Sequence, residues 1–143
     1  MFKRLITGAL SAAIALGASF TVVHADDELY IPMLSYRTGP FGGNGTPFAN
    51  GFHDYLAMLN ARDGGIGGAK LIMEECETAY NAQKGVECYE ATKGKGALVY
   101  NPPTTGITLQ LIPKSPVDKI PVLQMGYGLS AAAMGETFPW TFA

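Results

Sequence analysis

The chain has 143 residues and a formal net charge of −2, from 10 lysines and arginines against 12 aspartates and glutamates. This length suits one domain. A mildly acidic chain gives no electrostatic reason to bind nucleic acid or anionic lipid, so we expect neither as a partner.

The N-terminus has the pattern of a secretory signal peptide. Two positive residues, Lys3 and Arg4, precede the uncharged apolar stretch 5–23, and small residues follow at a cleavage site. We predict a signal peptide over residues 1–25 and a mature domain over residues 26–143. Removing the two positive charges takes the net charge from −2 to −4. An uncleaved transmembrane anchor is the alternative, because the apolar stretch is nearly long enough to span a bilayer.

The mature chain keeps two cysteines, Cys76 and Cys88. In an oxidising compartment an even number of cysteines is typical of a disulfide, so we predict a Cys76–Cys88 bridge, with two free thiols as the alternative. One histidine follows the predicted cleavage site, His53, and it falls outside the apolar face of a predicted helix. We expect a solvent-exposed histidine there. Two cysteines and one distant histidine make no zinc ligand set, so we expect no metal.

A strand and a helix are predicted first in the mature chain. The apolar run 29–35 indicates a buried strand, although Pro32 would remove one hydrogen bond from a central strand. A loop rich in turn residues, 38–45, follows. Thr46 is a good N-cap for the next helix, and Gly64 is typical of its end.

Strands and helices then alternate along the chain. Further strands are predicted at residues 69–76, 97–100 and 121–125. One helix is capped by Asn81, and a short helix follows the loop 101–106. This alternation predicts an α/β fold with a parallel sheet and helices on both faces.

In such sheets ligands bind beyond the carboxyl ends of the strands. Three segments are predicted to lie at that edge: residues 38–45, 101–105 and 126–130. Helix N-termini there would offer free backbone N–H groups to an anion or carboxylate, and Thr104 and Thr105 would add hydroxyl donors. Because this geometry needs no catalytic residue, we expect a binding protein and not an enzyme.

Two segments carry a resemblance to a known family. One is the turn Thr38-Gly39-Pro40-Phe41 between strand and helix, and the other is the block Asn-Ala-Arg-Asp-Gly-Gly-Ile-Gly-Gly from Asn60 to Gly68. Together they resemble the type I periplasmic solute-binding proteins, in the branch that binds leucine, isoleucine and valine for ABC transporters. The resemblance runs from about residue 29 onward. It implies the N-terminal lobe of a two-lobed receptor, incomplete because the chain stops before a second lobe.

The resemblance also implies a function and a site. A protein of this kind would work in the periplasm as a monomer without a cofactor. It would bind a small amino acid or related carboxylate and present it to an ABC permease in the inner membrane. Carried over by position, the residues that contact the solute are Phe41, Asn44, Thr104, Thr105, Gly126, Tyr127 and Leu129.

The chain also departs from the family pattern. Amino-acid binders often carry serines after the third strand, where Asn101-Pro102-Pro103 stands here. Tyr127 would suit a flatter or aromatic solute, or would simply pack on its neighbours. A ligand-sensing receptor is an alternative with the same lobe.

A dinucleotide-binding enzyme is the remaining alternative. Gly43-Asn44-Gly45 after a strand, with Glu74 and Glu75 ending the next, matches part of that fingerprint, but Phe48 occupies its third glycine position. We interpret the acidic residues Glu74, Glu75 and Glu77 as a solvated strand end.

Overall fold

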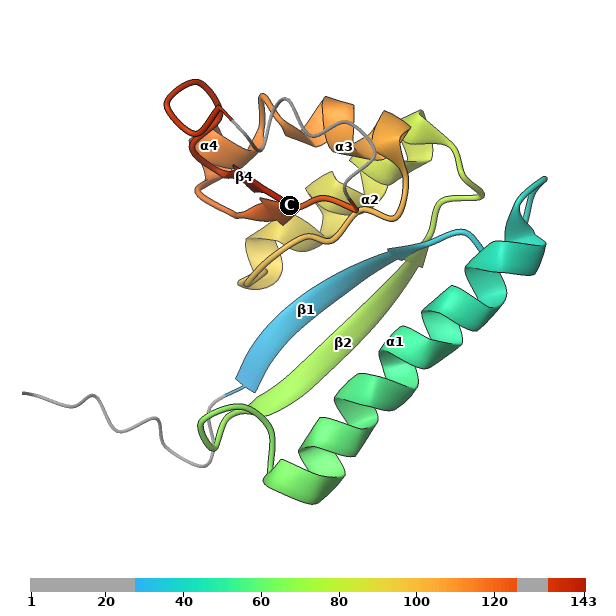
Figure 1. Ribbon diagram of the computed structural model, residues 1–143, viewed down its shortest axis with the longest axis vertical. Coiled ribbons are helices and arrows are strands. Elements are labelled where there is room, and N and C mark those ends of the chain that lie inside the picture. The colour runs from blue at the N-terminus through green and yellow to red at the C-terminus, as the bar shows by residue number, and fades with distance from the viewer. Residues whose placement is uncertain (1–27, 126–133) are drawn as a thin grey trace, which may run out of the picture.

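The computed structural model describes residues 28–125 and 134–143 (Figure 1). The predicted signal peptide, residues 1–25, lies outside the described residues. Three of the predicted solute contacts also lie outside them: Gly126, Tyr127 and Leu129.

The described strands run parallel, as predicted. Strand β1 (Glu28–Ser35) pairs with β2 (Lys70–Glu77), in a register that places Glu28 opposite Lys70. Strand β3 (Val122–Leu123) pairs with β4 (Thr141–Phe142). Bridges from the intervening segment 97–100 reach β1 on one side and β3 on the other. The order across the sheet is therefore β2, β1, segment 97–100, β3 and β4.

The predicted strand 97–100 is reduced to two isolated bridges. At one end the Leu98 N–H donates to the Tyr30 carbonyl at 2.9 Å, and at the other the Tyr100 N–H donates to the Pro121 carbonyl at 2.9 Å. In a parallel strand, every second residue directs its backbone N–H and C=O groups to the same neighbouring strand. Pro32 is two residues from Tyr30, so its backbone also faces the segment 97–100. Pro32 has no N–H to continue the ladder, which ends after one bridge.

Helices cover both faces of the sheet, as predicted. The described helices are α1 (Gly42–Asp63), α2 (Ala82–Thr92), the 3₁₀ turn η1 (Lys93–Lys95), α3 (Thr105–Leu111) and α4 (Ser115–Asp118). In Figure 1, α1 lies along one side of the β1–β2 pair, while α2 and α3 lie together on the other. Side chains alternate between these faces. No helix within the described ranges is long and apolar enough to cross a membrane.

The predicted N-cap of the first helix, Thr46, is wrong, because α1 begins four residues earlier at Gly42. The early start is possible because the first turn lies directly on the end of β1: a Cβ atom on Gly45 would come within 2.0 Å of the Tyr36 carbonyl oxygen. The Thr46 hydroxyl instead donates to the Arg37 carbonyl at 3.5 Å. The predicted helix end is confirmed, since Gly64 caps α1 with a left-handed φ of 72°.

Other local predictions are confirmed. The Asn81 side chain caps α2 by accepting a hydrogen bond from the Lys84 N–H at 3.0 Å. Cys76 of β2 and Cys88 of α2 form a disulfide with their Cα atoms 5.8 Å apart. The His53 side chain is exposed on α1.

The hydrophobic core lies between the sheet and the α2–α3 layer. Its fully buried side chains are Leu34, Tyr89, Tyr100, Ile107, Leu111 and Val122. The Tyr89 hydroxyl donates to Asp118 of α4 at 2.8 Å, and Lys93 approaches the same carboxylate at 3.0 Å. This contact attaches α4 to α2, and with it the segment that leads into β3.

Candidate functional site

A pocket of about 450 Å³ opens where the chain leaves the carboxyl ends of the parallel strands. Its lining comes from the loops that follow β1, β2, the 97–100 segment and β3, and from the first turns of α1 and α3. The lining residues are Tyr36, Phe41, Asn44, Tyr80, Pro103, Thr105 and Met125. This is the edge where open α/β sheets bind their ligands, so the pocket is the candidate site.

The pocket brings together three of the predicted solute contacts, Phe41 and Asn44 at the start of α1 and Thr105 at the start of α3. Thr104 lies behind the lining and is only 4% exposed. Its hydroxyl accepts a hydrogen bond from the Ile107 N–H at 3.2 Å and so caps α3. A solute contact by Thr104 stays a prediction.

Two aromatic residues that the sequence analysis missed line the same pocket, Tyr36 and Tyr80. The Tyr80 ring meets the Tyr36 ring edge-on, with centroids 5.0 Å apart, and the Phe41 ring at 4.3 Å in a tilted arrangement. Both tyrosines follow the carboxyl ends of paired strands. An aromatic residue at such a position is the sequence signal that could have found them.

Tyr80 sits in an uncommon backbone conformation. It has a φ of 62°, and Ala79 before it has a φ of 51°. Residues other than glycine rarely adopt the left-handed region, and such outliers persist only where the surroundings fix them. Here the Thr78 N–H donates to the Ser35 carbonyl at 2.8 Å, and the Asn81 N–H donates to the Thr78 carbonyl at 2.9 Å. These bonds fix the turn that presents the Tyr80 ring.

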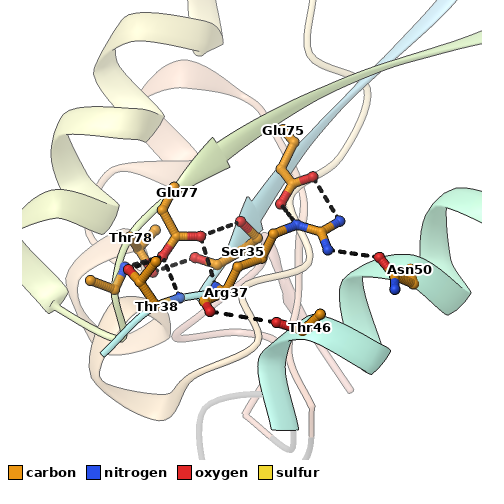
Figure 2. Close-up of polar contacts among 9 residues, drawn as sticks. Ser35, Arg37, Thr38, Thr46, Asn50, Glu75, Glu77 and Thr78 are labelled. Atoms are coloured by element: carbon orange, nitrogen blue, oxygen red, sulfur yellow. Dashed lines mark hydrogen bonds and ion pairs between the residues drawn. The ribbon is translucent and has the colours of Figure 1, made fainter. Parts of the chain in front are cut away.

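The Glu77 carboxylate joins this turn to the loop after β1 (Figure 2). It accepts hydrogen bonds from the Ser35 hydroxyl at 3.0 Å and the Arg37 N–H at 2.8 Å. It also accepts from the Thr38 hydroxyl at 3.0 Å and the Ala79 N–H at 2.8 Å. Burial acts to raise the pKa of Glu77, but the hydrogen bonds from Arg37, Ala79, Ser35 and Thr38 together outweigh it and lower the pKa to about 2.

Glu77 is therefore more than the solvated strand end that we predicted. The side chain is exposed, yet its carboxylate bonds both loops that carry the aromatic rings. Such an ionised acceptor with several N–H and O–H donors is a strong local constraint. Glu77 is a positioning residue, because it does not line the pocket.

The neighbouring acidic residue, Glu75, is also engaged. It forms an ion pair with the Arg37 guanidinium, in which the Arg37 Nη2 atom donates to Glu75 at 3.0 Å. The Arg37 Nη1 atom donates to Asn50 of α1 at 2.7 Å, which links β2 to α1 (Figure 2). The hydrogen bond from Arg37 holds the pKa of the Glu75 carboxyl below its usual range.

The pocket offers an aromatic wall, one amide and one hydroxyl. Among the described residues that line it, none carries a formal charge, and none is a cysteine, serine or histidine that would serve as a nucleophile or base. No three metal-ligating side chains gather anywhere in residues 28–125 and 134–143. This arrangement suits the binding of a small molecule.

The partial dinucleotide fingerprint does not have the required geometry. Gly43, Asn44 and Gly45 lie inside α1, whereas the fingerprint needs these glycines in a tight turn between strand and helix.

Comparisons with known proteins agree with this architecture. A family model described as a periplasmic binding protein matches residues 28–143. A solved structure named as an ABC transporter permease from the Pseudomonas fluorescens group shares 38% sequence identity, with a TM-score of 0.74. That match covers 81% of this chain and 29% of the other. The comparison with curated protein sequences found no match.

More distant solved structures share the fold. A fatty acid ABC transporter substrate-binding protein from Thermomonospora curvata has a TM-score of 0.68 at 16% identity, over 80% of this chain and 28% of the other. The branched-chain amino acid transporter substrate-binding protein LivJ from Streptococcus pneumoniae, in complex with isoleucine, has a TM-score of 0.67 at 16% identity. That match covers 81% of this chain and 33% of the other. This chain therefore spans about a third or less of these relatives.

Proposed function

Because the chain belongs to the periplasmic binding protein family, we propose that it forms the N-terminal lobe of the solute-binding component of an ABC transporter. The solute is a small amino acid or a related carboxylate, taken up from the periplasm. The observation that carries this proposal is the pocket at the carboxyl edge of the sheet, which has binding groups and an uncharged lining.

The solute contacts proposed for this lobe begin with Phe41, Asn44 and Thr105, which share the pocket. We extend the set to Thr104 and to Gly126, Tyr127 and Leu129, which follow the lining residue Met125 in the sequence. A second lobe would complete the cleft in a longer chain. The relatives named above are three or more times as long as the part that this chain matches, which supports that arrangement.

The proposed partners and location follow from the same family. The lobe acts as a monomer in the periplasm, after removal of the signal peptide 1–25, and delivers its solute to a permease in the inner membrane. It needs no cofactor and performs no catalysis. The family's name and the names of the solved substrate-binding relatives support a binding role.

Solute screening tests the proposal directly. The protein is expressed with its export signal and mixed with amino acids, aromatic acids and fatty acids. Its thermal unfolding is then measured with each solute. A solute present at a hundred times its dissociation constant should stabilise the fold by about 2.7 kcal/mol. Turnover of a substrate without stabilisation by any solute would refute the proposal. Genes for a permease and an ATPase beside this one would favour transport, whereas a kinase or chemoreceptor gene there would favour the alternative, ligand sensing.

A further inference from the structure

We propose that the pocket receives the ring of an aromatic solute, either an aromatic amino acid or an aromatic carboxylate, and that Tyr80 and Phe41 set this preference. This inference rests on the proposed function and narrows its solute class. The first observation is that the rings of Tyr36, Phe41 and Tyr80 converge in one pocket although they come from loops after two different strands.

The aromatic rings in the pocket leave part of their surface exposed. Tyr80 is in contact with both other rings, yet 40% of it stays exposed, and Phe41 is 47% exposed. Aromatic rings attract one another in tilted and edge-on pairs at centroid distances of about 4.5 to 7 Å. Because these rings retain exposed surface inside a pocket of about 450 Å³, a ring of the solute can extend the cluster.

The backbone at Tyr80 supports a role for the ring itself. A φ of 62° is easily adopted by glycine, whereas an aromatic residue adopts it rarely. Tyr80 gives little to the core, since it is partly exposed and its ring faces the pocket. Strained positions of this kind occur at ligand sites more than elsewhere. The hydrogen bonds to Glu77 and Ser35 fix this costly turn and so fix where the ring lies.

The charge of the lining favours the ring end of the solute over its ionised end. The charged groups on the strand ends and loops that bear the rings are already paired: Glu77 bonds the two loops, and Arg37 is paired with Glu75. Among the described residues, no charged side chain lines the pocket to pair with an ionised carboxylate or ammonium, so the aromatic wall suits the ring end of the solute. Asn44 and Thr105 can bond a polar substituent of the ring.

This inference is tested on the exported protein with pairs of ligands that differ in the presence of an aromatic ring. Benzoate is compared with cyclohexanecarboxylate, and phenylalanine with leucine, by calorimetric titration. Within each pair the charged groups are the same, and one member has an aromatic ring. We expect the aromatic member of at least one pair to bind about tenfold more tightly than its partner.

Two substitutions then locate the preference. Tyr80→Leu and Phe41→Leu should each weaken binding of the aromatic probe by about 3- to 10-fold, which corresponds to the interaction free energy of one aromatic pair. Tyr80→Phe keeps the ring and should keep the preference. Tyr55→Leu is the matched control, because Tyr55 is 57% exposed on α1, away from the pocket lining. Thermal unfolding of each variant without solute shows whether the variant is folded. If Tyr80→Leu does not fold, the binding comparison is made with Phe41→Leu alone.

The outcomes separate this inference from the proposed function. If the non-aromatic probes bind as tightly as the aromatic ones, or if only an aliphatic solute from the wider screen binds, the inference is refuted while the proposed function stands. If Tyr80→Leu and Phe41→Leu bind the aromatic probe as tightly as the Tyr55→Leu control, the assignment to these rings is refuted. If no solute of any class binds, both proposals fall.

Discussion

Replacing Glu77 by glutamine should destabilise the protein, and the loss should shrink as the pH falls below about 5. The substitution keeps the shape of the side chain but removes the charge that holds both pocket loops. It also turns one acceptor oxygen into an NH₂ group, which would face backbone N–H donors. The two loops would lose the shared acceptor that keeps Phe41 and Tyr80 together.

The structure sets the size of the effect. The pKa of the Glu77 carboxyl falls from 4.5 to about 2, a shift that corresponds to about 3 kcal/mol if none of it is screened. Because the side chain is exposed, solvent screening reduces this, and we expect a loss of about 1 to 2 kcal/mol near neutral pH. A carboxyl whose pKa is lower in the folded state than in the unfolded state stabilises the folded protein at pH values above the unfolded-state pKa. The stabilisation is therefore complete above about pH 5 and is lost as the pH falls towards 2.

Urea unfolding of the wild type and Glu77→Gln at about pH 7, 5 and 3 measures this dependence. Glu87→Gln is the matched control, because its carboxylate lies on the surface of α2 and bonds only the nearby Gln83 among the described residues. Two results would contradict the reasoning. One is a loss below about 0.5 kcal/mol at neutral pH, as for an ordinary surface residue. The other is a loss of equal size at about pH 3.

Other features give further predictions. Replacing both Cys76 and Cys88 by alanine should lower the free energy of unfolding by about 3 kcal/mol, because their separation of 12 residues sets the loop entropy; urea unfolding of both forms measures it. Tyr89→Phe removes the hydroxyl bonded to α4 and should cost about 1 kcal/mol in the same assay, whereas an unchanged midpoint would show that the bond is dispensable. Gly45→Ala should cost about 1 to 3 kcal/mol or more, because the new Cβ meets backbone at 2.0 Å. Its control, Gly43→Ala, meets nothing within 4 Å and should be neutral or stabilising; equal thermal shifts would refute the argument.

Local patterns predicted the parts of this fold that depend on neighbouring residues. The caps at Asn81 and Gly64, the alternation of strands and helices, and the pairing of the two cysteines each have a signal within the sequence. The start of α1 was missed because it depends on contact with the end of β1, which turn composition does not show. The same composition made residues 42–45 look like a loop.

The site was predicted only in part, for a similar reason. Phe41, Asn44 and Thr105 were found through a family resemblance that gives positions in loops. The role of Glu77 depends on partners about 40 residues away along the chain, and three neighbouring glutamates look alike in the sequence. The ring of Tyr80 reaches the pocket through a left-handed turn that few residues other than glycine adopt, so propensity argued against it.

The interrupted ladder at Pro32 has a mechanical consequence for the pocket. The sheet consists of two strand pairs, β1–β2 and β3–β4, coupled through a segment that bonds each pair at one bridge. The aromatic wall belongs to the first pair, whereas Pro103, Thr105 and Met125 follow the segment 97–100 and the second pair. The relative placement of the two walls of the pocket therefore depends on the packing of the buried core more than on backbone hydrogen bonds across the sheet.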